Sequence, residues 1–151
     1  MDELRRLTQR FFRRFGALSA DSTPCGKPLP IAHAHALMIL LNRGELSQQA
    51  LGAELCIDKS NVARLCAKMA RSRHLQQRSS EHDGRSRLVS LTARGTRLAQ
   101  EVESASRQRF ATLLDALPRT RRTDIVLALQ QLVEALEEVP NVTPAQTGSS
   151  A

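Results

Sequence analysis

The sequence has few of the side chains on which several classes of binding site are built. It contains no Trp and no Tyr, and aromatic residues make up 3% of the chain. We therefore do not expect a surface that stacks single-stranded bases on aromatic rings. No apolar run approaches the length of a membrane span, and residues 1–6 lack the apolar stretch of a secretory signal. These absences predict a cytoplasmic protein without membrane association.

Cysteine is also scarce: Cys25, Cys56 and Cys66 are odd in number and widely spaced. This spacing argues against a disulfide framework and a zinc knuckle, and it favours reduced thiols. His33 and His35 would point about 200° apart on a helix, so they cannot ligate one metal ion together. The sequence also lacks a Gly-rich phosphate loop, an H-E-x-x-H pattern and a nucleophile elbow. We expect no metal, no cofactor and no enzymatic activity.

Positive charge, by contrast, is abundant and unevenly distributed. The formal net charge is +7, and residues 43–97 carry 11 Lys and Arg against 5 Asp and Glu. Residues 98–151 carry 5 against 7. A basic surface of this kind favours a polyanionic partner, and its location in the middle of the chain predicts where phosphate contacts lie.

The length of 151 residues is typical of one compact domain. Apolar residues at steps of three and four predict an amphipathic helix over about 2–18. Residues 19–30 contain three Pro and one Gly and predict a loop. The apolar run that follows predicts a buried helix over 31–41, ending near Gly44.

Two short helices are then expected in close succession. Ser47 is a candidate N-cap for a helix over 48–55, and Asp58 for a helix over 59–71. The tight turn between them predicts a helix-turn-helix. Cys56 occupies a turn position that is often Gly, so we expect a backbone conformation there that does not require Gly. Gly52 costs about 1 kcal/mol of helix propensity relative to Ala, which predicts a close approach of the two helices.

The pattern changes to strands after residue 74. Residues 75–79 and 87–91 predict a β-hairpin around an Asp83-Gly84 turn. Thr92 then caps a long helix over about 93–117, which Pro118 interrupts, and a last helix follows over about 120–138. Residues 140–151 have the composition of a disordered tail. A helix-turn-helix followed by a basic hairpin predicts a winged helix over about 31–91, in a mainly α-helical domain with a small β wing (α+β) spanning 1–139.

Two segments resemble the MarR family of transcriptional regulators. Residues 83–95, D-G-R-S-R-L-V-S-L-T-A-R-G, resemble the family's wing signature, D-x-R followed by a short strand that ends in L-T-x-x-G. Residues 57–65, I-D-K-S-N-V-A-R-L, are similar to the start of its recognition helix. The resemblance covers roughly residues 1–138. It implies a repressor that binds a pseudo-palindromic double-stranded DNA operator as a homodimer, with dimerisation helices at both ends of the chain.

On this interpretation the second helix would enter the major groove, where Asn can pair with adenine and Arg with guanine. The base-reading candidates are Ser60, Asn61 and Arg64, whereas Lys59 and Lys68 would contact phosphate. The first helix N-terminus could bind phosphate through Ser47, Gln48 and Gln49, or these residues could serve only in capping. At the wing, Arg85 would reach a minor groove and Asp83 would orient it, while Arg87 could contact the DNA backbone or lie on the outer face of the sheet.

Regulators of this kind often bind small aromatic or lipophilic effectors. The residues expected near such a pocket are Phe11, Phe15, Cys25, His33 and His35. A lysine close to a thiol favours the reactive thiolate, so Lys27 beside Cys25 leaves a redox-responsive regulator that uses Cys25 as an alternative. A winged helix that binds another protein is a second alternative. It would predict a neutral or apolar recognition helix, whereas this one carries Lys59, Arg64 and Lys68.

Overall fold

The computed structural model describes residues 1–81, 84 and 86–139. The expected tail 140–151 and the wing residues Asp83 and Arg85 lie outside the described residues. The chain divides into two compact units, residues 1–110 and 111–151, which we describe separately.

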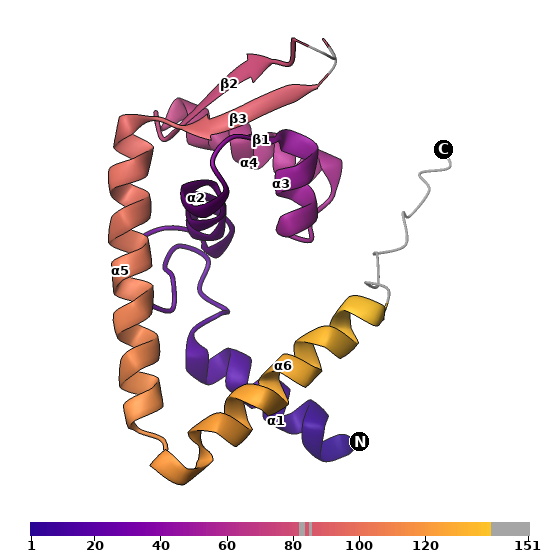
Figure 1. Cartoon of the computed structure of the whole chain (residues 1–151), viewed down its shortest axis with the longest axis vertical. Coiled ribbons are helices and arrows are strands. Elements are labelled where there is room, and N and C mark those ends of the chain that lie inside the picture. Colours follow the sequence, from indigo (N-terminus) through magenta and orange to yellow (C-terminus); the bar gives the residue numbers. More distant parts are fainter. Residues whose placement is uncertain (82–83, 85, 140–151) are drawn as a thin grey trace, which may run out of the picture. The chain divides into compact units, whose positions relative to one another are not determined.

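The first unit contains most of the secondary structure (Figure 1). Its elements in chain order are α1 (Asp2–Phe15), α2 (Ile31–Arg43), β1 (Leu46–Ser47), α3 (Gln48–Glu54), α4 (Lys59–Arg71), β2 (Leu75–Ser79), β3 (Arg87–Leu91) and the greater part of α5 (Ala93–Asp115). The expected helix-turn-helix, hairpin and long helix are therefore confirmed. No described helix is long and apolar enough to cross a membrane.

Three helices have the N-cap residues that the sequence predicts, and each cap accepts a hydrogen bond through a hydroxyl or carboxylate oxygen. Ser47 Oγ accepts a hydrogen bond from the backbone N–H of Ala50 at 3.0 Å, and Asp58 Oδ1 accepts one from Asn61 at 2.8 Å. Thr92 Oγ1 accepts from the N–H of Gly95 at 3.0 Å. Each cap satisfies a donor that the first helical turn leaves without an intrahelical partner.

The first helix is shorter than the sequence predicts. We expect it over 2–18, but α1 ends at Phe15 because Gly16 adopts a left-handed conformation with φ of 90°. The Gly16 N–H donates to the carbonyl of Phe12, which closes the helix. Leu18, which continued the apolar pattern, is exposed outside the helix.

The wing sheet has three strands rather than the two of the expected hairpin. β2 and β3 pair antiparallel with Leu75 opposite Leu91, and the short strand β1 pairs with the other edge of β3. A two-residue strand is too short to show alternation, so no periodic signal marks β1. It joins the start of the helix-turn-helix directly to the wing.

The core of the first unit is formed around α2. Ala36, Leu37 and Leu40 of this helix are buried with residues of the other elements. The other members of the buried cluster are Ala34, Leu51, Val62, Cys66, Met69, Leu75, Val89, Ala99 and Val102. The helices α3, α4 and α5 and the strands β2 and β3 all contribute to this cluster. The helix-turn-helix and the long helix α5 therefore both pack on α2.

The turn between α3 and α4 corrects one expectation. Cys56 has a φ of 54°, so it adopts the left-handed conformation that favours Gly, although we expected the cysteine to exclude it. The turn is held by hydrogen bonds, including one from the N–H of Ile57 to the carbonyl of Gly52 at 3.0 Å. Gly52 has the expected role, because a Cβ there would lie 3.1 Å from Val62 Cγ1.

The second unit contains a short 3₁₀ helix, Arg119–Arg121, and α6 (Arg122–Glu138). The Arg122 side chain donates to the carbonyl of Leu117 at 3.3 Å and lies 3.5 Å from the Asp115 carboxylate. These contacts hold the turn after Pro118. Several apolar side chains of α6 are exposed, namely Ile125, Val126, Leu127, Leu129, Val133 and Leu136.

Candidate functional site

A groove of about 640 Å³ lies where α3, α4 and β3 meet. Four of its lining residues are Gln48, Gln49, Lys59 and Arg87, which the sequence places among the candidate DNA contacts. The other lining residues are Gly52, Ala53, Ile57, Val62 and Ser86. The fold therefore brings polar side chains from three separate elements into one concave surface beside the helix-turn-helix.

The exposed face of α4 carries the candidate base readers. Ser60, Asn61, Arg64 and Lys68 are all exposed, whereas Val62, Cys66 and Met69 are buried on the opposite side. Asn61 contacts two neighbours: its Nδ2 donates to Asp58 Oδ2 at 2.6 Å, and its Oδ1 accepts from Arg64 Nη2 at 2.6 Å. The pKa of Asp58 is lowered, mainly by the hydrogen bond from the Asn61 backbone N–H.

Basic residues of the wing differ in how they are paired. Arg78 of β2 makes two hydrogen bonds to the Glu45 carboxylate, at 2.9 and 2.6 Å, so its charge is largely balanced. Arg87 of β3 donates to the side-chain oxygen of Gln77 at 3.1 Å, a neutral partner. Among the described residues, this contact leaves the positive charge of Arg87 unbalanced at the groove. The sequence does not reveal the pairing of Arg78, because Glu45 is distant from it along the chain.

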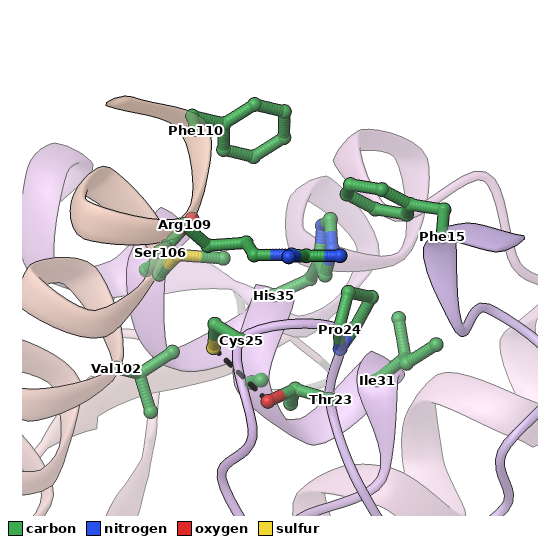
Figure 2. Close-up of a pocket in the computed structure, with 12 residues that line it drawn as sticks. Phe15, Thr23, Pro24, Cys25, Ile31, His35, Val102, Ser106, Arg109 and Phe110 are labelled. Carbon is green, nitrogen blue, oxygen red and sulfur yellow. Dashed lines mark hydrogen bonds between the residues drawn. The ribbon is translucent and has the colours of Figure 1, made fainter. Parts of the chain in front are cut away.

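A second concave feature, a cavity, lies between α2, α5 and the loop before α2 (Figure 2). This cavity has a volume of about 270 Å³, and its lining is mostly apolar. Of the five residues expected at a ligand pocket, Phe15, Cys25 and His35 line it. Phe11 does not, but its ring stacks on Phe15 with 5.1 Å between centroids.

His33 differs from the expectation because it does not line the cavity. It is buried, and its Nε2 lies 3.2 Å from Nδ1 of His74, the residue that precedes β2. Burial is the main cause that lowers the pKa of His33 to about 4, and burial also lowers the pKa of His74. Both rings are therefore neutral near pH 7. On α2 the side chains at 33 and 35 face different ways, so only one can reach the cavity.

Several cavity residues were not predicted from the sequence. Val102, Ser106, Arg109 and Phe110 contribute one face of α5, and Figure 2 shows the Arg109 side chain extending toward His35 and Phe15. The spacing of these residues at steps of four, three and one is helical, and it could have marked this face. What the sequence could not indicate is that α2 and the loop lie against it.

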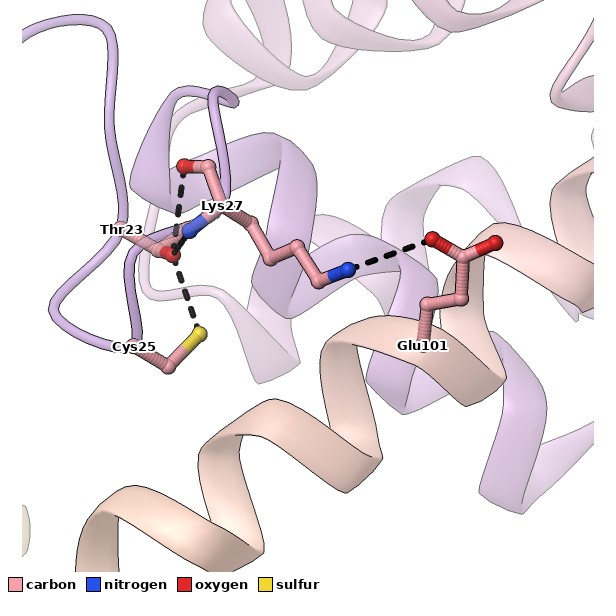
Figure 3. A network of polar contacts seen from close by, with 4 residues as sticks. All are labelled: Thr23, Cys25, Lys27 and Glu101. Atoms are coloured by element: carbon pink, nitrogen blue, oxygen red, sulfur yellow. Dashed lines mark hydrogen bonds and ion pairs between the residues drawn. The ribbon is translucent and has the colours of Figure 1, made fainter.

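The loop that forms one wall of the cavity is held by polar contacts (Figure 3). Thr23 Oγ1 lies 3.0 Å from the Cys25 sulfur and accepts from the Lys27 backbone N–H at 2.9 Å. The Lys27 ammonium donates to Glu101 Oε2 of α5 at 3.2 Å. The lysine that we expected to act on the Cys25 thiol is thus paired with a carboxylate instead.

We compared the chain with models of protein families and with curated proteins. Residues 27–86 match the model of the MarR family, so the match covers the helix-turn-helix and part of the wing. No curated protein is detectably similar to the chain in sequence.

Solved structures resemble the chain over most of its length. FabT of Streptococcus pneumoniae in complex with DNA is 15% identical with a TM-score of 0.76, over 91% of this chain and 99% of FabT. The PcaV transcriptional regulator of Streptomyces coelicolor in complex with its natural ligand is 20% identical with a TM-score of 0.66, over 88% and 90%. BpsR of Bordetella bronchiseptica, whose DNA binding is regulated by 6-hydroxynicotinic acid, is 24% identical with a TM-score of 0.67, over 87% and 96%.

At these identities the structural likeness establishes the fold, and the family match covers its helix-turn-helix. The chain therefore has a winged helix-turn-helix fold, and its residues 27–86, which include the helix-turn-helix, match the model of the MarR family.

Proposed function

We propose that the chain is a repressor that binds a pseudo-palindromic double-stranded DNA operator as a homodimer and is released by a small-molecule effector. The observation that carries the proposal is the polar groove between α3, α4 and β3, which contains Lys59 and Arg87. A winged helix that binds a protein partner would not need this concentration of basic and amide side chains.

Each part of the groove has a distinct role in this proposal. The N-terminal half of α4 lies in the major groove with Ser60, Asn61 and Arg64 toward the bases, and Lys59 and Lys68 contact phosphate. Gln48 and Gln49 at the start of α3 donate to phosphate, while Ser47 serves mainly as the cap. Arg87 contacts the DNA backbone, and Arg85, oriented by Asp83, enters a minor groove.

Salt dependence of binding tests the proposal. Duplexes selected from a random library should bind with a logarithm of affinity that falls linearly with the logarithm of salt concentration, because phosphate contacts release counterions. Fluorescence anisotropy at several salt concentrations measures the slope. Binding that responds neither to salt nor to sequence would contradict the proposal.

The homodimer is supported by apolar side chains that remain exposed in each unit. Leu4, Leu7, Phe11 and Phe12 of α1 are about half exposed, and α6 carries the further set described above. Exposed apolar groups in such number favour association, since their burial is worth about 25 cal/mol per Å². A second copy also doubles the contacts with DNA and explains a two-fold symmetric operator.

The effector proposal is supported by the cavity between α2, α5 and the loop. Its walls include Phe15, Val102 and Phe110, and its polar side chains include Arg109 and His35. An apolar pocket with a few polar groups is typical of a small-molecule site. The combination of aromatic walls with a guanidinium favours an aromatic or lipophilic acid, whose carboxylate would pair with Arg109.

Calorimetry with 6-hydroxynicotinic acid and a series of hydroxybenzoic acids would test this site. We expect a carboxylic acid of this group to bind, and its uncharged amide to bind more weakly. Arg109→Gln should lower the affinity for the acid about tenfold or more, because a charge-assisted hydrogen bond is lost. The affinity for the amide should be unchanged. An equal loss for acid and amide would contradict the role of Arg109. Release from DNA that requires oxidation of Cys25 would favour the redox alternative.

A further inference from the structure

The recognition helix contains a chain of hydrogen bonds that bears on how it reads DNA. We propose that Asn61 does not read a base itself but positions Arg64, and that Arg64 alone specifies one G·C base pair through guanine. This inference rests on the proposed DNA-binding function. It replaces base reading by Asn61 with positioning, and it assigns recognition of one G·C pair to Arg64.

The chain of hydrogen bonds begins at the helix N-cap. Asp58 Oδ1 accepts from the backbone N–H of Asn61 at 2.8 Å, which fixes the carboxylate on the helix. Asp58 Oδ2 accepts from Asn61 Nδ2 at 2.6 Å, and Asn61 Oδ1 accepts from Arg64 Nη2 at 2.6 Å. Residues 58, 61 and 64 are three apart, so they lie along one face of α4.

The chemistry of the three groups determines which of them donates and which accepts each of these side-chain hydrogen bonds. A carboxylate can only accept hydrogen bonds, and a guanidinium can only donate them. The carboxamide of Asn61 must therefore present its NH₂ to Asp58 and its oxygen to Arg64. Arg64 is tied through these bonds to an acid that is itself bound to the helix backbone, which restricts the orientation of its guanidinium.

Both ends of the Asn61 carboxamide are used in this arrangement. Bidentate recognition of adenine requires the amide oxygen and the amide NH₂ of Asn at the same time. Asn61 would have to break the contacts with Asp58 and Arg64 to make that pair. Arg64 has five N–H donors, of which the bond to Asn61 occupies one, so guanine recognition is compatible with the contact.

Base preference in three variants distinguishes positioning from direct reading. Wild-type protein is first used to select duplexes from a random library, and affinities are then measured for all single base-pair changes in the selected sequence. Arg64→Ala should lose preference at one G·C pair by about tenfold or more. Asn61→Ala should lose preference at the same pair, and the double variant should resemble Arg64→Ala, because both substitutions remove one interaction.

Two further variants separate positioning from helix stability and from phosphate binding. Asp58→Ser keeps an N-cap oxygen but cannot hold both the backbone and the Asn61 side chain. It should therefore weaken preference at the same G·C pair while the protein remains folded. Lys68→Ala, on the same helix, is the control. It should lower the affinity for all duplexes to a similar extent.

A measurement without DNA examines the hydrogen bond between Asp58 and Asn61 directly. NMR titration should show a higher Asp58 pKa in Asn61→Ala than in the wild type, because the side-chain hydrogen bond that lowers it is lost. An unchanged Asp58 pKa would overturn the inference.

The remaining outcomes separate the inference from the function on which it rests. If Asn61→Ala loses preference at an A·T pair, or if its losses add to those of Arg64→Ala, Asn61 reads a base and the inference is wrong. If Arg64→Ala keeps every base preference, the inference is also wrong, although the protein still binds DNA. If the wild type selects no sequence at all, the proposed function itself fails.

Discussion

At the scale of single residues, the buried pair His33 and His74 is an unusual feature of the core. Their ring nitrogens lie 3.2 Å apart, and the charged groups that act on them, Lys68 and Arg94, are both positive. A proton on either ring would therefore be both desolvated and repelled. The pair links α2, which lines the cavity, to the segment between α4 and β2.

We expect this pair to make the folded state less stable in acid. The pKa of His33 is about 4 in the folded state against an ordinary value of 6.5, so the unfolded state binds the proton more tightly. Stability is then full above pH 6.5 and falls as the pH decreases toward 4. The loss for His33 is about 3 kcal/mol by the usual conversion of a pKa difference.

Urea denaturation at a series of pH values between 7.5 and 4 measures this effect. The matched variant is His33→Gln, which keeps a polar side chain at position 33 but has no group that titrates in this range. The variant should show a shallower decrease between pH 6.5 and 4. An identical pH profile in both proteins would exclude His33 as the source.

At the scale of elements, the start of α5 is joined closely to the end of α4. Thr92 Oγ1 donates to the carbonyl of Arg73 at 2.6 Å and accepts from the N–H of Gly95, so one hydroxyl connects two elements. Gly95 allows this approach, because a Cβ there would lie 1.9 Å from the His74 carbonyl oxygen. The Thr and Gly of the L-T-x-x-G motif thus hold the wing against the long helix.

Removing this hydroxyl should destabilise the first unit. Thr92→Ala loses the cap of α5 and the bond to Arg73, and we expect a cost of about 1–2 kcal/mol in free energy of unfolding. Thr92→Ser keeps both hydrogen bonds and should recover most of that stability. Denaturant titration with both variants measures the difference, and equal losses in the two would contradict the role of the hydroxyl.

The element scale also explains how the cavity wall is supported. The loop before α2 is tied to α5 by Lys27 and Glu101, whose side chains are both partly exposed. A pair of this kind contributes about 1 kcal/mol or less to stability. Its main consequence is geometric, because it holds Cys25 and Thr23 near α5.

At the scale of the whole molecule, the exposed apolar residues point to association. Leu129 and Leu136 of α6 are 55% and 62% exposed although they continue the helix's apolar pattern. We expect Leu129→Glu to convert the proposed dimer to a monomer in sedimentation velocity experiments, since a charge would have to be buried in the interface. Binding to a two-half-site duplex should weaken in parallel.

The control for this substitution lies on the same helix. Gln131→Glu introduces the same charge at an exposed polar position of α6 and should leave the sedimentation behaviour unchanged. A Leu129→Glu protein that remains dimeric at micromolar concentration would contradict a role for this face in the interface.

The sequence alone was sufficient for the features that depend on near neighbours. The caps Ser47, Asp58 and Thr92, the bounds of α4, β2 and β3, and the small residue at Gly52 all follow from local chemistry and periodicity. Local rules failed at Cys56, where the tight turn imposes a left-handed backbone on a residue that rarely adopts it.

Tertiary structure decided what depends on segments that are distant along the chain. The pairing of β1 with β3, the burial of His33 against His74 and the place of Arg109 beside His35 required the packed fold. The scarcity of aromatic residues illustrates the difference. From the sequence it excluded a base-stacking surface, but only the fold places Phe15 and Phe110 with 5.6 Å between ring centroids, at one cavity. Composition limits which surfaces a chain can build, whereas long-range packing determines where its few special side chains meet.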